Sequence, residues 1–176
     1  MEKKWTIRKV TKHDIQAIFA VTLVSWLDTY VNNQLEITRE FIMESQIKYL
    51  TYDFYSNECR FHYFNNTEDN LYLVAEDEDG IIVGFLHCQR VDDRQLLDGI
   101  YLLPELKGTG LAQEFAEIFL DWEKKDIDTE LGVVSYNDRA IRFYEKLGFK
   151  PNGVTYKIRD KIPCIDMVKK NVKEEK

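Results

Sequence analysis

The order of periodic segments in this chain predicts an α+β fold built on a mixed, largely antiparallel sheet. Two strand-like runs, 71–76 and 81–90, flank Asp77-Glu78-Asp79-Gly80, a sequence typical of a β-hairpin. Residues 99–122 then run from an apolar strand through a glycine-bearing loop into a strongly amphipathic helix. A hairpin gives antiparallel pairing and a crossover helix gives parallel pairing, so both orientations are expected in one sheet.

The N-terminal segment predicts one strand and one long helix. Polar and apolar residues alternate over 5–10, as in a half-buried strand. Thr11 stands three residues before Asp14, a spacing that resembles a capping box at a helix start. Apolar residues then recur at helical spacing over 15–31.

A second helix is expected from Thr38. Its expected apolar positions, spaced i, i+4 and i+7, are Met43, Ile47 and Leu50. Residues 51–70 are rich in Tyr, Phe and Asn and indicate only a short strand near 60–63.

The second half of the chain alternates strands with helices. Strands are expected over 95–103, 131–135, 154–159 and 163–168. The helix after Gly110 has an apolar stripe made of Leu111, Phe115, Ile118, Phe119 and Trp122. Another helix is expected over 138–147, with Gly148 where left-handed geometry commonly ends helices. With no repeat and no linker before the charged segment 169–176, a single domain over residues 1–176 is predicted.

Composition favours a soluble, cytoplasmic globular protein. Hydrophobic residues make up 44% and charged residues 31%. No apolar run approaches the ~20 residues that span a bilayer, and the N-terminus has no signal-peptide core. The net charge of -7 argues against a nucleic-acid ligand and mildly favours a cationic substrate. The scattered cysteines and histidines indicate reduced thiols and no metal site; they are Cys59, Cys88, Cys164, His13, His62 and His87.

The glycine loop predicts an anion site. Gly108 and Gly110 expose backbone N–H groups, and the following helix directs the positive end of its dipole to the same place. A dinucleotide fingerprint would need a third glycine where Gln113 stands, and a Walker loop would need its lysine after the glycines, whereas Lys107 precedes them. Both nucleotide interpretations are therefore disfavoured.

Two motifs resemble those of the GNAT acetyltransferases. Residues 107–112 are similar to the pyrophosphate loop (Arg/Gln)-x-x-Gly-x-(Gly/Ala), with Gly110 and Ala112 at its small positions and Lys107 in place of Arg or Gln. The second signature, Asn-x-x-Ala-x-x-Phe-Tyr-x-x-x-Gly-Phe, is matched by Asn137, Ala140, Phe143, Tyr144, Gly148 and Phe149. The resemblance implies a GNAT fold over most of the chain, in which two neighbouring strands splay apart to admit acetyl-CoA.

The same resemblance implies which residues bind acetyl-CoA. Main-chain groups of Ile100, Tyr101 and Leu102 would pair with pantetheine. The pyrophosphate would lie on Lys107, Gly108, Thr109, Gly110, Leu111 and Ala112. Asn137, Ala140, Phe143 and Tyr144 would contact the rest of the arm. Ordinary roles stay open: the glycines suit any turn, Asn137 suits a helix N-cap, and Ala140 and Phe143 suit helix packing.

Catalysis is expected to involve Tyr144 and Asp98. The matching tyrosine of many GNAT enzymes protonates the departing thiolate, which a phenol of pKa ~10 can do without large tuning; a buried core tyrosine is the alternative. A carboxylate on the strand before the phosphate loop often deprotonates the amine, and Asp98 stands there. Strand alternation predicts that it shares a side with Ile100 and Leu102; an edge carboxylate is the alternative.

The acceptor is expected to be a primary amine. Trp26, Asp28 and Tyr30 fall where GNAT proteins form the acceptor pocket, although core packing also suits the two aromatics. Residues 24–31 and the tyrosine-rich region resemble bacterial polyamine acetyltransferases, which favours spermidine or spermine. A protein N-terminus or lysine, or a catalytically silent acyl-CoA sensor, are the alternatives. Homodimers are common in the family, so a homodimer is also an expectation.

Overall fold

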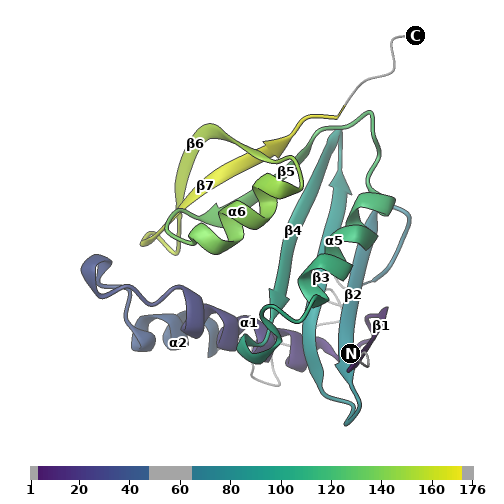
Figure 1. Cartoon of the computed structure of the whole chain (residues 1–176). Coiled ribbons are helices and arrows are strands. Elements are labelled where there is room, and N and C mark those ends of the chain that lie inside the picture. Colours follow the sequence, from purple (N-terminus) through teal and green to yellow (C-terminus); the bar gives the residue numbers. More distant parts are fainter. Residues whose placement is uncertain (1–3, 48–64, 172–176) are drawn as a thin grey trace.

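One seven-stranded sheet organises residues 4–47 and 65–171, the part of the chain that this computed structural model describes (Figure 1). From one edge to the other the strands are β1 (Trp5–Lys9), β2 (Asn70–Asp77), β3 (Ile82–Val91), β4 (Arg94–Leu102), β5 (Thr129–Val134), β7 (Ile162–Lys169) and β6 (Lys150–Ile158). The β4–β5 pair is parallel and the other neighbours are antiparallel. The mixed, largely antiparallel α+β fold is therefore confirmed.

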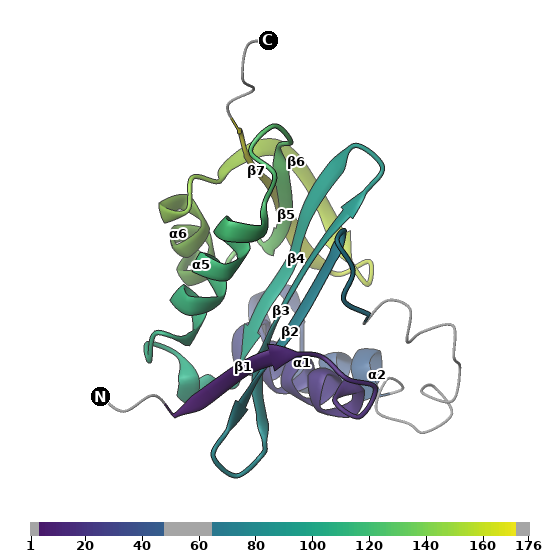
Figure 2. The same ribbon diagram turned by 90° about the vertical axis from the view of Figure 1, so that its right-hand side faces the viewer.

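Helices cover both faces of the sheet (Figure 2). Two of them, α1 (Ile15–Thr29) and α2 (Arg39–Ile47), lie on one face. The short 3-10 helix η1 (Asn33–Leu35) lies between them in the chain. The other face carries α5 (Leu111–Trp122) and α6 (Asp138–Lys146), and a 3-10 turn, η4 (Pro104–Leu106), links β4 to the loop before α5.

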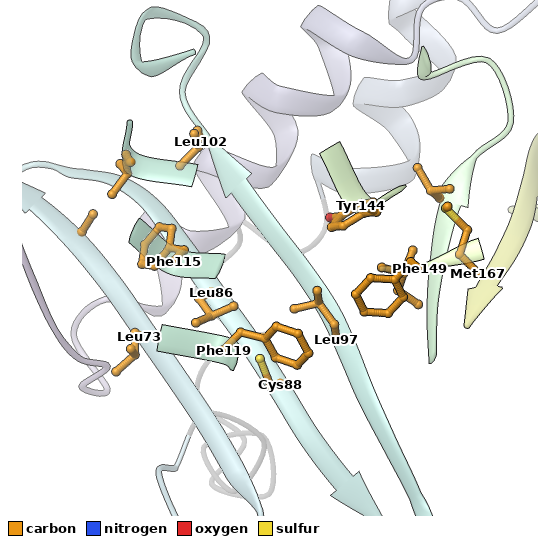
Figure 3. Packing of buried hydrophobic residues seen from close by; sticks show 14 of the residues in the cluster. Leu73, Leu86, Cys88, Leu97, Leu102, Phe115, Phe119, Tyr144, Phe149 and Met167 are labelled. Atoms are coloured by element: carbon orange, nitrogen blue, oxygen red, sulfur yellow. The ribbon is translucent and has the colours of Figure 1, made fainter. Parts of the chain in front are cut away.

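The main core lies between the sheet and the α5–α6 layer (Figure 3). Phe115 and Phe119 of α5 are fully buried against Leu86 and Leu97, and Phe119 lies 6.3 Å from the ring of Phe149. Each large apolar side chain buried in this way stabilises the fold by about 1.5–3 kcal/mol. This packing fixes α5, and therefore the loop that precedes it, against the sheet.

The sheet opens between β4 and β5. Their ladder consists of Gln95↔Thr129 and Leu96↔Glu130, after which the strands diverge while β5 continues along β7. At the joined end the buried amide of Gln95 donates to Thr129 Oγ1 at 2.7 Å. The splayed strand pair expected from the GNAT resemblance is thus present.

Most predicted elements form with shifted ends. The long helix ends at Thr29 instead of Val31, and β5 begins at Thr129 instead of Leu131. The last hairpin differs more, because β6 starts at Lys150, four residues before the expected strand. Residues 151–153 are Pro, Asn and Gly, residue types that are frequent in turns, and the structure accommodates them as an irregularity in the β6–β7 register.

The prediction of which residues of α2 face the core is wrong. Met43 and Ile47 are 42% and 52% exposed, whereas Ile42 and Gln46 are buried. Ile42 packs into a cluster with Trp26, Tyr30 and Ile37, so the helix is rotated by one residue relative to the prediction. Leu50, the strand near 60–63, Cys59 and His62 lie outside the described residues.

Two features that bear on function are absent from the described residues. None of their helices is long and apolar enough to cross a membrane. Residues 4–47 and 65–171 also contain no group of three or more His, Cys, Asp or Glu side chains that could hold a metal ion.

Candidate active site

The main chain of the loop between η4 and α5 borders an open space at its two glycines. Gly108 and Gly110 have φ of +83° and +102°, a region that side chains rarely adopt, and a Cβ built on either would meet nothing within 4 Å. The hydroxyl of Thr109 turns inward and donates to the Leu106 carbonyl at 2.7 Å. Because the first turn of a helix has amide N–H groups without intrahelical acceptors, the start of α5 offers donors to an anion at this place.

The exposed edge of β4 supplies further main-chain groups. The N–H of Leu103 donates to the Val83 carbonyl of β3 at 2.9 Å. Main-chain groups alternate in direction along a strand, so those of Tyr101 also point to β3, and those of Ile100 and Leu102 point to the gap that β5 leaves open. An extended ligand in this gap can therefore pair with Ile100 and Leu102.

Loop, gap and α6 enclose a cleft of about 180 Å³. Its lining residues are Ser25, Thr29, Ile100, Leu102, Lys107, Gly108, Ala112, Asn137, Arg139, Ala140, Phe143 and Tyr144. The motif residues from two distant parts of the chain thus meet in one place. Ser25, Thr29 and Arg139 were not expected here, since neither motif marks them.

A smaller cavity of about 70 Å³ adjoins the cleft. The residues that it shares with the cleft are Ser25, Thr29, Ile100, Asn137, Ala140 and Tyr144. Its own lining residues include Tyr30, Asp98, Gly99, Tyr101, Gly132 and Val133. The smaller cavity therefore lies deeper in the gap between β4 and β5, with Tyr144 at the boundary of the two spaces.

Tyr144 is a buried phenol at this boundary. Its ring meets Phe143 and Phe149 edge-on, with centroids 5.5 and 6.0 Å apart, and the residue is 8% exposed. Figure 3 shows Tyr144 and Phe149 in the same packed cluster. Burial raises its pKa well above the usual value, although the backbone N–H of Ile100 acts in the opposite direction. The hydroxyl therefore keeps its proton at neutral pH and is available as a donor.

Asn137 caps α6 and lines both spaces. Its side-chain oxygen accepts the N–H of Ala140 at 3.2 Å, as an N-cap does. The cap uses only the side-chain oxygen, and Asn137 also lines both cavities, so the capping and binding interpretations are compatible.

The predicted orientation of Asp98 is wrong. Asp98 is an extra residue in β4: Leu97 pairs with Cys88 and Gly99 with His87, which leaves it in a β-bulge. The bulge breaks the alternation, so its carboxylate lies on the face of His87, 3.3 Å from Nδ1, and not with the side chains of Ile100 and Leu102. It still lines the smaller cavity, and burial raises its pKa.

The expected acceptor residues divide into three roles. Trp26 is buried in the core 5.0 Å from the ring of Tyr30, and it does not line either of the two cavities. Tyr30 does line the smaller cavity. Asp28 forms an ion pair with Lys107, so two residues expected to bind different ligands contact each other.

The side chains of three other expected cofactor residues do not line the larger cleft. Leu111 is a fully buried core residue at the start of α5. Thr109 holds the loop by its bond to Leu106. Tyr101 stacks on Phe85 at 5.1 Å on the α1 side of the sheet, so its side chain borders the smaller cavity and not the larger one.

Comparison with known proteins identifies the family. The profile of the acetyltransferase (GNAT) family matches residues 35–149, more than half of the chain. The chain therefore belongs to the GNAT acetyltransferase family, whose enzymes use acetyl-CoA as cosubstrate.

Individual relatives agree with this assignment. Uncharacterized N-acetyltransferases of Mycobacterium bovis and Mycobacterium tuberculosis are 40% identical over 92 residues, which cover 49% of this chain and 58% of theirs. The chain thus spans little more than half the length of the curated relatives it matches. PaiA N-acetyltransferase from Thermoplasma acidophilum, solved in complex with coenzyme A, is 26% identical, with a TM-score of 0.71 over 96% of this chain and 99% of that one. A Corynebacterium glutamicum structure described as histone acetyltransferase HPA2 and related acetyltransferase shares the fold, with a TM-score of 0.68 at 19% identity over 97% of this chain and 98% of that one.

The residues present fit coenzyme A. The space in front of Gly108 and Gly110 is one that a side chain would fill, and it lies at a helix start suited to pyrophosphate. The free edge of β4 suits the amide-bearing pantetheine arm, which needs extended main chain as a partner. The cleft connects both features.

Proposed function

We propose that this protein is an acetyl-CoA-dependent N-acetyltransferase that acts on a primary amine by direct transfer. The observation that carries the proposal is the convergence of a glycine loop, an open strand edge and a buried phenol on one cleft. A binding protein needs the first two features only. The phenol at the boundary of the two cavities supports an enzyme.

In this proposal the chain binds its cosubstrate through main chain. Amide groups of the loop and of the first turn of α5 hold the pyrophosphate, and Ile100 and Leu102 align the arm in the gap of the sheet. Lys107 and Arg139 line the cleft and supply positive charge. Acetyl-CoA supplies the acetyl group as an activated thioester.

Two side chains move protons. Tyr144 Oη holds the proton that the departing thiolate takes, and its raised pKa keeps the donor form present. Asp98 lines the adjoining cavity and accepts a proton from the ammonium form of the acceptor, leaving the lone pair that attacks. The two groups border the same cavity, so one acceptor nitrogen can be served by both.

We favour a polyamine such as spermidine or spermine as the acceptor. The smaller cavity carries a carboxylate, Asp98, and two tyrosine rings, Tyr30 and Tyr101, which together suit an alkylammonium. The chain as a whole has a net charge of -7, which favours the approach of cations. The contact of Asp28 with Lys107 makes Asp28 a partner of the loop, and it is not part of this acceptor proposal.

An assay of thiol release from acetyl-CoA tests both levels of the proposal. Spermidine, a simple monoamine and a peptide with a free N-terminus are compared across ionic strength. We expect spermidine to be the best substrate, and its kcat/KM to fall with salt more than that of the monoamine, since exposed charges are screened over ~10 Å at about 0.1 M salt.

Turnover of the peptide alone would replace the polyamine with a protein acceptor and leave the acetyltransferase proposal standing. Tight binding of acetyl-CoA without turnover of any amine would indicate a silent acyl-CoA sensor instead.

A further inference from the structure

A buried histidine lies directly behind Asp98. His87 on β3 has its Nδ1 3.3 Å from Asp98 Oδ2 and its Nε2 2.9 Å from Asn70 Oδ1. Its ring stacks on Tyr72, with centroids 4.4 Å apart and planes 22° apart. Asn70 therefore holds one edge of the ring and Tyr72 one face, while Nδ1 on the other edge lies close to the Asp98 carboxylate.

The neighbour of Asn70 decides which ring nitrogen carries the proton. The Nδ2 group of Asn70 donates to the carbonyl of Asn65 at 2.6 Å, which fixes the orientation of the amide. Oδ1 must then face His87, and an amide oxygen only accepts hydrogen bonds. The hydrogen of a neutral imidazole at this position is therefore on Nε2, and the lone pair is on Nδ1, the nitrogen that lies 3.3 Å from Asp98 Oδ2.

A lone pair and an ionised carboxylate repel each other at this distance, whereas a protonated carboxyl donates to Nδ1. On the basis of the proposed function, we propose that His87 is a positioning residue that makes Asp98 a stronger base: the proton removed from the acceptor ammonium rests on Asp98 Oδ2, hydrogen-bonded to His87 Nδ1. The proton leaves the amine nitrogen, whose N–H bonding pair becomes the attacking lone pair.

The titratable groups around His87 and Asp98 are uncharged at neutral pH, so the transferred proton stays with this pair. Burial lowers the pKa of His87 to about 4, so the free imidazole is neutral at pH 7. The titratable groups that lie near the pair are Tyr72 on β2 and Tyr101 on β4, together with Cys88, which follows His87 in β3 and packs on the opposite face of the sheet. Burial raises the pKa of each, so all three are uncharged. Tyr30 of α1 and Tyr144 of α6 border the same cavity, and both are uncharged for the same reason. Gln89 bonds the carboxylate and opposes its protonation.

NMR tests the pair without any need for activity. The ring nitrogens of His87 should show the Nε2–H tautomer at neutral pH. The carboxyl carbon of Asp98 should titrate about 1 pH unit higher in the wild type than in His87→Phe, which keeps the stacked ring and removes the lone pair. Asn70→Ala, which frees the tautomer and keeps the imidazole, should lower the Asp98 titration as well.

Kinetics test the role of the pair in the reaction. With one amine, the acidic limb of kcat/KM should move down by about 1 pH unit in His87→Phe, and the control His13→Phe, an exposed histidine, should keep the wild-type profile. An Nδ1–H tautomer, or an Asp98 titration that is the same in wild type and both variants, would overturn the inference. An acetyltransferase with an unchanged pH profile in His87→Phe would do so too, while absence of turnover with the expected NMR result would overturn only the proposed function.

Discussion

Lys107, on the loop before α5, forms an ion pair with Asp28 in the last turn of α1. The two side chains are 27% and 39% exposed. The pair joins the proposed pyrophosphate loop to the helix that contributes Ser25 and Thr29 to the cleft. If the loop binds the pyrophosphate as proposed, Asp28 competes with that anion for the charge of Lys107.

Asp28→Asn is expected to change the free energy of unfolding by less than about 1 kcal/mol, since exposed ion pairs contribute little. Because Lys107 loses this competing carboxylate, coenzyme A should bind more tightly at low salt, with the gain reduced at high salt. Calorimetry on Asp28→Asn and Lys107→Gln measures both effects. Weaker binding in Asp28→Asn would show that the carboxylate holds Lys107 in its binding position.

Gly110→Val should weaken acetyl-CoA binding severely, because its side chain would occupy the open space in front of the loop. The positive φ adds a backbone strain of about 1–2 kcal/mol. Gly153→Val is a matched control, since Gly153 has φ of +89°, an equally open Cβ position and a place in β6. Calorimetry should show lost affinity in the first variant only; full affinity in a folded Gly110→Val protein would refute the assignment of the loop.

Tyr144→Phe keeps the ring and its packing and removes the proton donor. We expect kcat to fall ~10²–10⁴-fold, the range for one acid–base group, with the affinity for coenzyme A nearly unchanged. The control Tyr136→Phe loses a hydrogen bond to the Tyr30 carbonyl, which should cost about 1 kcal/mol of stability and little activity. If the chemical step limits the rate and kcat of Tyr144→Phe is still normal, water or another group must protonate the departing thiolate.

Asp14 should make stability depend on pH. It is buried and accepts hydrogen bonds from Arg8 at 2.7 and 2.8 Å and from the N–H of Thr11 at 2.7 Å. The hydrogen bonds from Arg8 lower its pKa from 3.8 to about 2. A depressed folded-state pKa means that this stabilisation is complete above about pH 4 and is lost as the pH falls towards 2.

Asp14→Asn should therefore lower stability at pH 7 by about 1.5–3 kcal/mol, the range for hydrogen bonds to charged groups, and flatten the pH dependence in that window. Urea unfolding from pH 2 to 7 measures both, with Asp121→Asn at an exposed position as the control. An unchanged pH dependence in Asp14→Asn would show that another carboxyl is responsible.

The loop and the order of elements were predictable because their signals are local. A pair of close glycines before an amphipathic helix determines its own backbone geometry, and the observed φ values at Gly108 and Gly110 follow from that requirement. Core packing of Phe115 and Phe119 follows equally from helical spacing. Sequence reasoning succeeds where neighbours in the chain are also neighbours in space.

The side of β4 on which Asp98 lies could not be predicted, because it depends on pairing with another strand. The bulge exists only as a mismatch between Leu97↔Cys88 and Gly99↔His87. The rotation of α2 was missed for a similar reason: Ile42 is buried by contacts with other elements. Arg139 and Ser25 carry no motif, and the fold alone brings them to the cleft.

The two residue pairs that join β4 to β5 have a mechanical consequence. A seam this short at one end of the sheet acts as a pivot, since a small rotation about it widens the gap without breaking the ladders within β1–β4 or β5–β7. The width at the open end can therefore change without the loss of a main-chain hydrogen bond within either half of the sheet. To admit an acyl group thicker than acetyl, the two halves of this sheet need only change the angle between β4 and β5. In a continuous sheet, the same widening would break a row of main-chain hydrogen bonds.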